Sequence, residues 1–325
     1  MKITVSANAR LHMGFLDLHG GLGRQFGSIG VALDNLRTSV TLTSPADTAP
    51  GFLEGSGEDS ARALRYAAKV RDEFGSRMPL SVSVDQAITP HAGLGSGTQL
   101  ALAVGLGVSR LLARSDTEEE IAQLLGRGKR SAIGISCFKH GGFVIDGGKG
   151  SESSLPPTLM RLRFPERWRL ILIFDKQHQG VNGSEEVAAF ERLPRFPDSA
   201  AAHLCRLTLM RLMPGLVEQD VTAFGAAVTE IQQIVGDHFA PVQGGRFASP
   251  GVRRHIEWFE QNGAPGVGQS SWGPTGFALC ASSRQAEQLI ANVPEQIRDA
   301  NVELGVYQAT NSAGQVGVPA CLETV

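Results

Sequence analysis

The sequence predicts an α+β fold in two domains, with largely antiparallel sheets. At 325 residues the chain is long enough for two domains. Strand-like and helix-like patterns are mixed along it without the regular alternation that builds a parallel sheet. A segment at 147–160 contains several glycines and serines and two prolines, which is typical of a boundary. We therefore place the domains at residues 1–155 and 156–325.

Periodicity predicts the elements of the first domain. Strands are expected where polar and apolar residues alternate or where a short apolar run is bounded by turn residues: 2–8, 28–33, 38–43, 80–84 and 143–146. A glycine-dense loop is expected at 19–27, and amphipathic helices at 60–74 and 97–113. A further helix should begin at Thr117, because Glu120 three residues later completes a capping box, and end at Gly126.

The second domain shows the same mixture of patterns. A buried strand is expected at 168–174, followed by three helices between about 184 and 235. A helix at 250–261, two short strands within 267–280, a helix from Ser283 and a last strand at 302–309 complete the prediction.

Composition excludes several classes of function. The net charge of −2 gives no basic field for nucleic acid or an anionic membrane surface. Apolar runs such as 170–174 are too short to cross a bilayer, and the first residues do not resemble a signal peptide. Four scattered cysteines fit reduced thiols better than a disulfide framework or a zinc site. We expect a cytoplasmic protein with small-molecule partners and no nucleic-acid or membrane partner.

Glycine accounts for 39 of 325 residues, against about 7 % in average proteins. The stretch HAGLGSGTQ at 91–99 leads into the helix expected from Gly97. The first N–H groups of a helix lack intrahelical partners, so a glycine loop there suits a phosphate. The stretch is neither a Walker A loop nor a dinucleotide fingerprint, because Thr98 and Gln99 stand where those motifs need other residues. A glycine-rich turn before a capped helix remains the alternative.

Two further glycine motifs flank this loop: ANARLHMGFLDLHGGLGRQFG at 7–27 and GQSSWGPTGFAL at 268–279. The three motifs, in this order and over nearly the whole chain, resemble those of the GHMP kinase superfamily. That resemblance implies a ribosomal-protein-S5-like N-terminal domain and a ferredoxin-like C-terminal domain, and it allows a homodimer.

The chain departs from the kinases of that superfamily. Many of them carry an aspartate after the phosphate loop, but no acidic residue stands between Lys129 and His140. GSGTQ also replaces the usual GSSAA, and the run GRGKRSAIGISCFKHGGFVIDGG at 126–148 is similar to the β-ribofuranosylaminobenzene 5′-phosphate synthase family. That resemblance implies a pentosyltransferase of methanopterin biosynthesis. It would join 5-phosphoribosyl-1-pyrophosphate to 4-hydroxybenzoate or 4-aminobenzoate and release CO₂ and pyrophosphate. The alternatives are an ATP-dependent small-molecule kinase and a non-catalytic sensor of a phosphate ligand.

The resemblance also implies roles for individual residues. Asp17 would bind Mg²⁺ or the ribose hydroxyls, and Arg24 would hold a carboxylate or phosphate; a surface ion pair is the alternative for both. His178 is a candidate for deprotonating the para substituent of the acceptor. Trp272 would stack on the acceptor ring, unless it is a core residue. The remaining residues expected to bind substrate or phosphate are Arg10, His12, His91, Gly93, Leu94, Gly95, Ser96, Gly97, Thr98, Gln99, Arg130, Ser131, Ser271, Gly273, Thr275 and Gly276.

Overall fold

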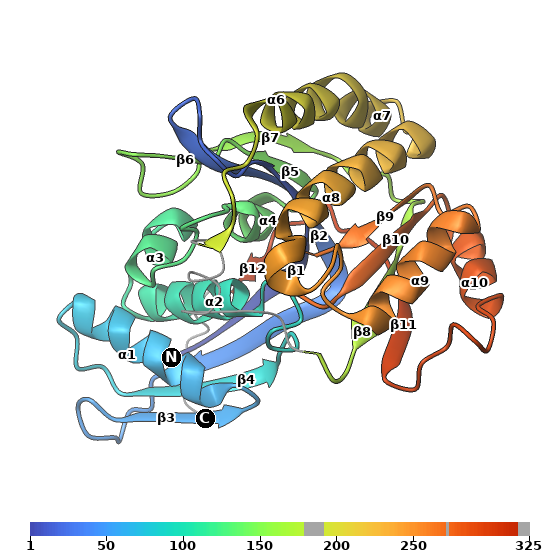
Figure 1. Cartoon of the computed structure of the whole chain (residues 1–325). Helices are drawn as coiled ribbons and strands as arrows, with labels where there is room; N and C mark the ends of the chain where they lie inside the picture. The colour runs from blue at the N-terminus through green and yellow to red at the C-terminus, as the bar shows by residue number, and fades with distance from the viewer. Residues whose placement is uncertain (179–191, 271–272, 318–325) are drawn as a thin grey trace.

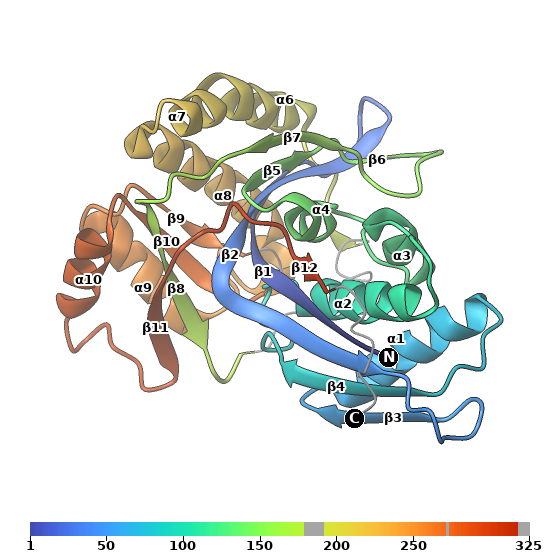
Figure 2. The ribbon, with the colours of Figure 1, turned by 180° about the vertical axis from the view of Figure 1, so that it is seen from behind.

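The computed structural model describes residues 1–178, 192–270 and 273–317. Within these residues, eight strands form one sheet and four form a second, with helices packed on both (Figures 1 and 2). All strand pairs are antiparallel except β3 with β4. The α+β prediction is therefore confirmed.

The large sheet has the order β12-β1-β2-β4-β3, and β5, β6 and β7 extend it beside β2. Its strands are β1 (Lys2–Asp17), β2 (Arg24–Thr43), β3 (Leu53–Gly57), β4 (Leu80–Gln86), β5 (Phe143–Asp146), β6 (Lys149–Gly150), β7 (Thr158–Leu162) and β12 (Gln315–Val316). The small sheet has the order β11-β8-β10-β9. Its strands are β8 (Arg169–Asp175), β9 (Gly266–Gln269), β10 (Gly276–Cys280) and β11 (Val302–Tyr307).

Helices cover these sheets in three groups (Figure 1). The first group lies with the large sheet: α1 (Ser60–Glu73), α2 (Ser96–Leu111), α3 (Glu118–Leu124) and α4 (Ile133–His140). The second group packs on β1 through its first and last helices: α6 (Asp198–Leu207), the π-helix η1 (Thr208–Leu212), α7 (Met213–Val217) and α8 (Val221–Gln243). The third group packs on the small sheet: α9 (Pro250–Gln261) and α10 (Ser283–Ala291). None of the described helices is long and apolar enough to cross a membrane.

The prediction for the first glycine motif was wrong. The strand expected at 2–8 continues as β1 to Asp17, and the strands expected at 28–33 and 38–43 are one strand, β2. Helices α2 and α4 contact β1, as do α6 and α8, so its middle is buried on both faces and loses the alternation that marks a half-buried strand. Arg10 and His12 therefore lie within a central strand, not at a strand end.

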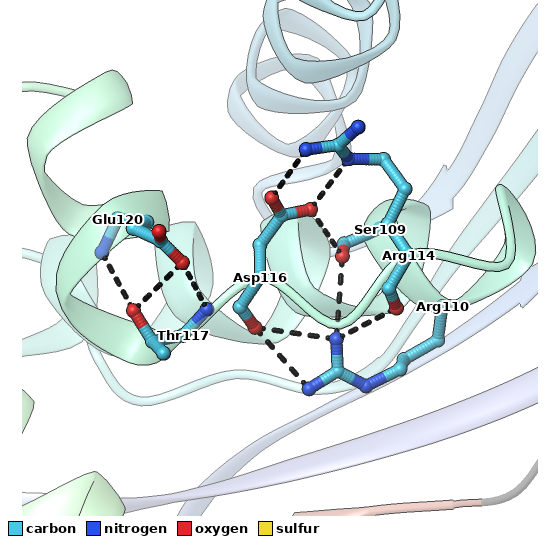
Figure 3. Close-up of polar contacts among 6 residues, drawn as sticks. All are labelled: Ser109, Arg110, Arg114, Asp116, Thr117 and Glu120. Carbon is cyan, nitrogen blue, oxygen red and sulfur yellow. Dashed lines mark hydrogen bonds and ion pairs between the residues drawn. The ribbon is translucent and has the colours of Figure 1, made fainter.

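The capping box predicted at the start of α3 is confirmed (Figure 3). The Thr117 N–H donates to Glu120 Oε2 at 2.7 Å, and the Glu120 N–H donates to Thr117 Oγ1 at 3.3 Å. Beside it, Arg114 donates to both carboxylate oxygens of Asp116, which lowers the pKa of that carboxyl. These contacts fix the turn that joins α2 to α3 (Figure 3).

The two halves of the chain share one hydrophobic core, which includes Leu11 of β1, Trp168, Phe224 of α8 and Phe277 of β10. Two strands that follow residue 155 also pair with the N-terminal sheet: β7 with β5, and β12 with β1. The boundary at 155/156 stays a prediction, and the hydrogen-bonded sheets are not divided there.

Candidate functional site

The last glycine motif closes directly on the central one. Ser270 Oγ donates to the carbonyl of Gly93 at 2.6 Å, and Thr275 Oγ1 donates to the carbonyl of Ala92 at 2.6 Å. A Cβ on Gly273 would lie 2.3 Å from Gly93 Cα, which is closer than real Cβ contacts. Both positions must therefore be glycine for the two loops to touch.

The first motif meets the same place through β1. The Arg10 N–H donates to the carbonyl of Leu94 at 3.1 Å, and Arg10 Nη1 donates to the carbonyl of Gly93. The Arg10 side chain lies along the loop, because a Cβ on Gly95 would be 3.1 Å from Arg10 Cγ. The three glycine motifs thus converge on the residues before α2.

Helix α2 begins with two backbone amides that are not paired within the helix. Its N-cap, Gly95, has φ +83°, a conformation that favours glycine. The N–H groups of Thr98 and Gln99 both donate to the Gly95 carbonyl, whereas those of Ser96 and Gly97 have no intrahelical partner. Together with the helix dipole they make an anion-binding position.

His12 is a buried titratable group beside this junction. The residue is only 1 % exposed, and neither ring nitrogen has a hydrogen-bond partner among the described residues. Burial, and then the charge of Arg10, hold the pKa of His12 well below its ordinary value. The ring is therefore neutral, and its backbone N–H donates to Ser270 Oγ at 3.2 Å.

An aromatic cluster, defined as Phe15, Phe26, Phe196, His238 and Phe239, extends from His12. The His12 and Phe15 ring centroids are 4.5 Å apart. Neighbouring rings of the cluster lie 4.9–6.3 Å apart. The cluster borders a cavity of about 540 Å³, which we name the hairpin cavity because it lies at the β1–β2 turn. Its lining is Leu18, His19, Gln25, Phe26, Arg130, Leu193, Pro194, Arg195, Phe196 and His238.

Arg130 and Ser131 lie between the hairpin cavity and α2. Ser131 Oγ donates to Asp146 at 3.2 Å, and the buried Asp146 also accepts the Ala132 N–H at 2.9 Å. Burial raises the pKa of Asp146 to about 6, against the lowering effect of these hydrogen bonds. In α4, the carbonyl of Gly134 accepts Gln99 Nε2 at 2.9 Å. The start of α4 thus connects α2 to the cavity wall that contains Arg130.

Asp17 is the last residue of β1, and Arg24 is the first residue of β2. Each is at least seven residues from Arg10 along the chain. Seven extended residues span roughly 20 Å, so these side chains lie near the hairpin cavity and not at the glycine junction. Asp17 Oδ1 accepts the N–H groups of His19 and Gly20 at 2.9 and 2.8 Å. Arg24 donates to the carbonyls at 147 and 148 at 2.8 Å each. Their catalytic and metal-binding roles stay predictions.

The other expected site residues are more scattered. His178 follows β8, and its N–H donates to Asp175 Oδ1 at 3.1 Å. Gly276, the first residue of β10, pairs with Ile173 near the same end of β8. Gly276 itself packs inside the small sheet, where a Cβ would lie 2.5 Å from Val252. His91 is exposed. Ser271 and Trp272 lie outside the described residues.

Two cations lie beside Gly97, Arg62 and Arg127, of which sequence reasoning missed Arg62. A Cβ on Gly97 would lie 3.3 Å from Arg127 Nη1 and 3.5 Å from Arg62 Nη1. Arg127 stands in the basic run GRGKR, which gave a weak signal. Arg62 looks like any polar residue of an amphipathic helix, so no sequence signal marked it.

Comparison with known proteins agrees with this geometry. Profiles described as GHMP kinases N-terminal domain and GHMP kinases C terminal match residues 61–143 and 212–299. The β-ribofuranosylphenol 5′-phosphate synthase of Methanothermobacter thermautotrophicus is 31% identical over 296 residues, 86% of this chain and 89% of the relative. That of Archaeoglobus fulgidus is 32% identical over 289 residues, 85% and 87% of the two chains. The chain belongs to this synthase family.

Solved structures place the synthase family within the GHMP kinase fold. Homoserine kinase from Cytophaga hutchinsonii has a TM-score of 0.66 at 20% identity and covers 97% of each chain. Mevalonate diphosphate decarboxylase from Staphylococcus aureus has a TM-score of 0.68 at 15% identity, also over 97% of each chain. The superfamily resemblance and the fold class predicted from the three glycine motifs are both confirmed.

Proposed function

We propose that this chain is a pentosyltransferase that joins 5-phosphoribosyl-1-pyrophosphate to a para-substituted benzoate, with loss of pyrophosphate and CO₂. The observation that supports it most directly is the convergence of three glycine motifs and Arg10 on the start of α2. The relatives are named for a phenol product, which favours 4-hydroxybenzoate over 4-aminobenzoate as the acceptor.

The reaction needs no covalent enzyme intermediate. The ring carbon that bears the carboxylate attacks C1 of the ribose, and the bond from C1 to pyrophosphate breaks with its electron pair. The carboxylate then leaves as CO₂, and the electrons of that bond restore the aromatic ring. The para hydroxyl or amino group supplies the electron density that makes the ring carbon nucleophilic.

The donor would bind at the glycine junction. The Ser96 and Gly97 amides, which have no partner within the helix, the dipole of α2 and the Arg10 guanidinium all present positive charge there. These groups are fixed by the fold before the donor arrives, so they can stabilise the charge that develops on the leaving group at little reorganisation cost.

The acceptor would bind in the hairpin cavity. Its aromatic cluster offers ring faces and edges for a benzoate, and Arg130 and Arg195 in its lining offer cations for the carboxylate. His12 lies between this cluster and the glycine junction, with Phe15 on one side and Ser270 on the other. A neutral imidazole there can bind a hydroxyl of the ribose or of the acceptor.

Magnesium would be carried mainly by the donor. Among the described residues no group of three or more His, Cys, Asp and Glu side chains could hold a metal ion. Magnesium bound by substrate phosphates needs only one or two protein carboxylates, and it would neutralise charge on the leaving pyrophosphate. Asp17 keeps one carboxylate oxygen outside its two backbone hydrogen bonds but lies near the hairpin cavity, so we assign it to the ribose hydroxyls and not to the magnesium on the pyrophosphate.

The assay is direct. Purified protein, magnesium, the phosphoribosyl donor and either benzoate should release pyrophosphate and CO₂ in equal amounts. No release with any para-substituted benzoate would refute the proposal. Formation of ADP from ATP with a small alcohol substrate would instead support the kinase alternative.

The proposal also includes the cellular location and the oligomeric state of the enzyme. We expect the enzyme to act in the cytoplasm and to form a homodimer. Exposed apolar side chains at Leu209, Met210 and Val217 give α7 and η1 a surface that a second copy could cover. Sedimentation analysis of the wild type and of Met210→Glu tests the dimer, which the variant should dissociate.

A further inference from the structure

Two guanidinium groups from different parts of the chain meet above Gly97. Arg62 lies in the first turn of α1, and Arg127 follows α3. Each has a terminal nitrogen within 3.5 Å of the position that a Cβ on Gly97 would occupy. The two nitrogens are therefore within about 7 Å of each other, beside the first turn of α2. A side chain at position 97 would fill the space between them.

Both arginines are held in place by α1. Arg62 forms an ion pair with Asp59, the residue before that helix, and both side chains are less than one-fifth exposed. Arg127 donates to the hydroxyl of Tyr66 and lies over its ring, 5.3 Å from the centroid. The tyrosine is neutral, so Arg127 keeps its full charge. These contacts fix the position of both groups before any ligand binds.

This pair combines buried donors with concentrated positive charge, of which Asp59 offsets only the share of Arg62. The Nε atoms of both Arg62 and Arg127 are buried and have no hydrogen-bond partner among the described residues. Two like charges at this separation repel each other, and the positive end of α2 adds to the repulsion. An anion bound above Gly97, within reach of the terminal nitrogens, would offset this repulsion.

We propose that Arg62 and Arg127 bind the pyrophosphate group of the donor. This inference rests on the proposed function and assigns one end of that substrate to one part of the site. Arg10 lies at Gly95 and the two other arginines lie at Gly97, so guanidinium groups flank both sides of the first turn of α2. A pyrophosphate presents two phosphate groups to this surface, whereas the 5′-phosphate presents one.

The assignment also agrees with where negative charge accumulates during the reaction. Pyrophosphate gains negative charge as its bond to the ribose breaks, and cations that contact it bind the transition state more tightly than the ground state. The 5′-phosphate and the ribose would then extend away from α2, toward His12 and the hairpin cavity. This places the reacting carbon between the two parts of the site.

Binding of inorganic pyrophosphate tests the proposal without turnover. Calorimetric titration in magnesium chloride should give affinities about tenfold or more weaker for Arg62→Gln and for Arg127→Gln than for wild type. Arg65→Gln changes an exposed arginine of the same helix and is the matched control, with an unchanged affinity. Affinity for ribose 5-phosphate should be unchanged in all three variants. Arg127→Lys, which keeps the charge but not the forked donors, serves if Arg127→Gln fails to fold.

The outcomes separate this inference from the proposed function. Failure of pyrophosphate to bind wild type, unchanged affinity in both glutamine variants, or an equal loss of ribose 5-phosphate binding would each overturn the inference. Absence of synthase turnover together with arginine-dependent pyrophosphate binding would overturn the proposed function and leave a polyphosphate site at Gly97.

Discussion

Replacement of His12 by leucine separates a ligand-binding histidine from a structural one. The His12 ring is buried with both nitrogens unpartnered among the described residues. A buried polar group without a hydrogen bond costs about 1–3 kcal/mol, and a swap of similar volume costs less than about 1.5 kcal/mol. His12→Leu should therefore be as stable as wild type near pH 8, or up to about 2 kcal/mol more stable. Turnover should fall roughly 100-fold if the imidazole contacts the substrates.

The same variant should change the response to acid. Burial lowers the pKa of His12 in the folded protein, so the unfolded state binds a proton that the folded state refuses. This group alone then lowers the free energy of unfolding as the pH falls below about 6.5, by about 1 kcal/mol between pH 6.5 and 5.5. His12→Leu lacks this group, so its free energy of unfolding should fall by that much less.

Denaturant unfolding at a series of pH values measures both effects, and His255 supplies the control. His255 is equally buried, but its Nδ1 pairs with the carbonyl of Gly251 at 2.8 Å. His255→Leu should destabilise the protein by about 1–3 kcal/mol and leave turnover unchanged. If His12→Leu behaves as His255→Leu does, His12 has a structural partner and our interpretation of the site fails.

Three further variants probe other parts of the site. Gly273→Ala should raise the KM for the donor roughly tenfold, because its Cβ would lie 2.3 Å from Gly93 Cα and overpacking costs about 1–3 kcal/mol; an unchanged KM would mean that the loops do not form the donor site. Asp17→Asn keeps an oxygen for the two backbone N–H groups, so the melting temperature should be unchanged, while turnover falls roughly tenfold or more because the charged acceptor for a ribose hydroxyl is lost; parallel losses of both would argue for a structural role. Burial raises the pKa of Asp146 to about 6, so this carboxyl alone should lower the free energy of unfolding by about 2 kcal/mol as the pH rises from 4 to 7. Asp146→Asn should not show that loss in urea titrations, and an identical pH profile would contradict it.

Hydrophobic periodicity and capping residues predicted most helices and strands well, because both depend on residues that are close together in the sequence. The helix at 250–261 coincides with α9, and the capping box at Thr117 begins α3 as expected. The strand β1 was cut short because alternation fails where helices cover both faces of a sheet. Which elements lie on both sides of a strand is a property of the whole fold, and no window of sequence contains it.

The candidate site was likewise predicted only in part. Arg10 and the glycine loop were predicted and meet at the start of α2. Arg62 was missed, since its guanidinium reaches Gly97 only when α1 packs beside α2. Asp17 and Arg24 were assigned by resemblance, and the structure adds that backbone groups of the hairpin and of the loop at 147–148 already occupy part of their hydrogen-bonding capacity.

Glycine located the site better than any charged residue, and the reason is geometric. Gly93 and Gly273 are 180 positions apart, yet their backbones are in contact, and neither position has room for a Cβ. Long charged side chains can reach a ligand from many positions, so the sequence constrains their location weakly. Close backbone contact can be made only where no Cβ intervenes, and it must be satisfied at both contacting positions at once. A second dense glycine segment far along the chain is therefore evidence of where the first one docks, even where each segment alone predicts only a turn.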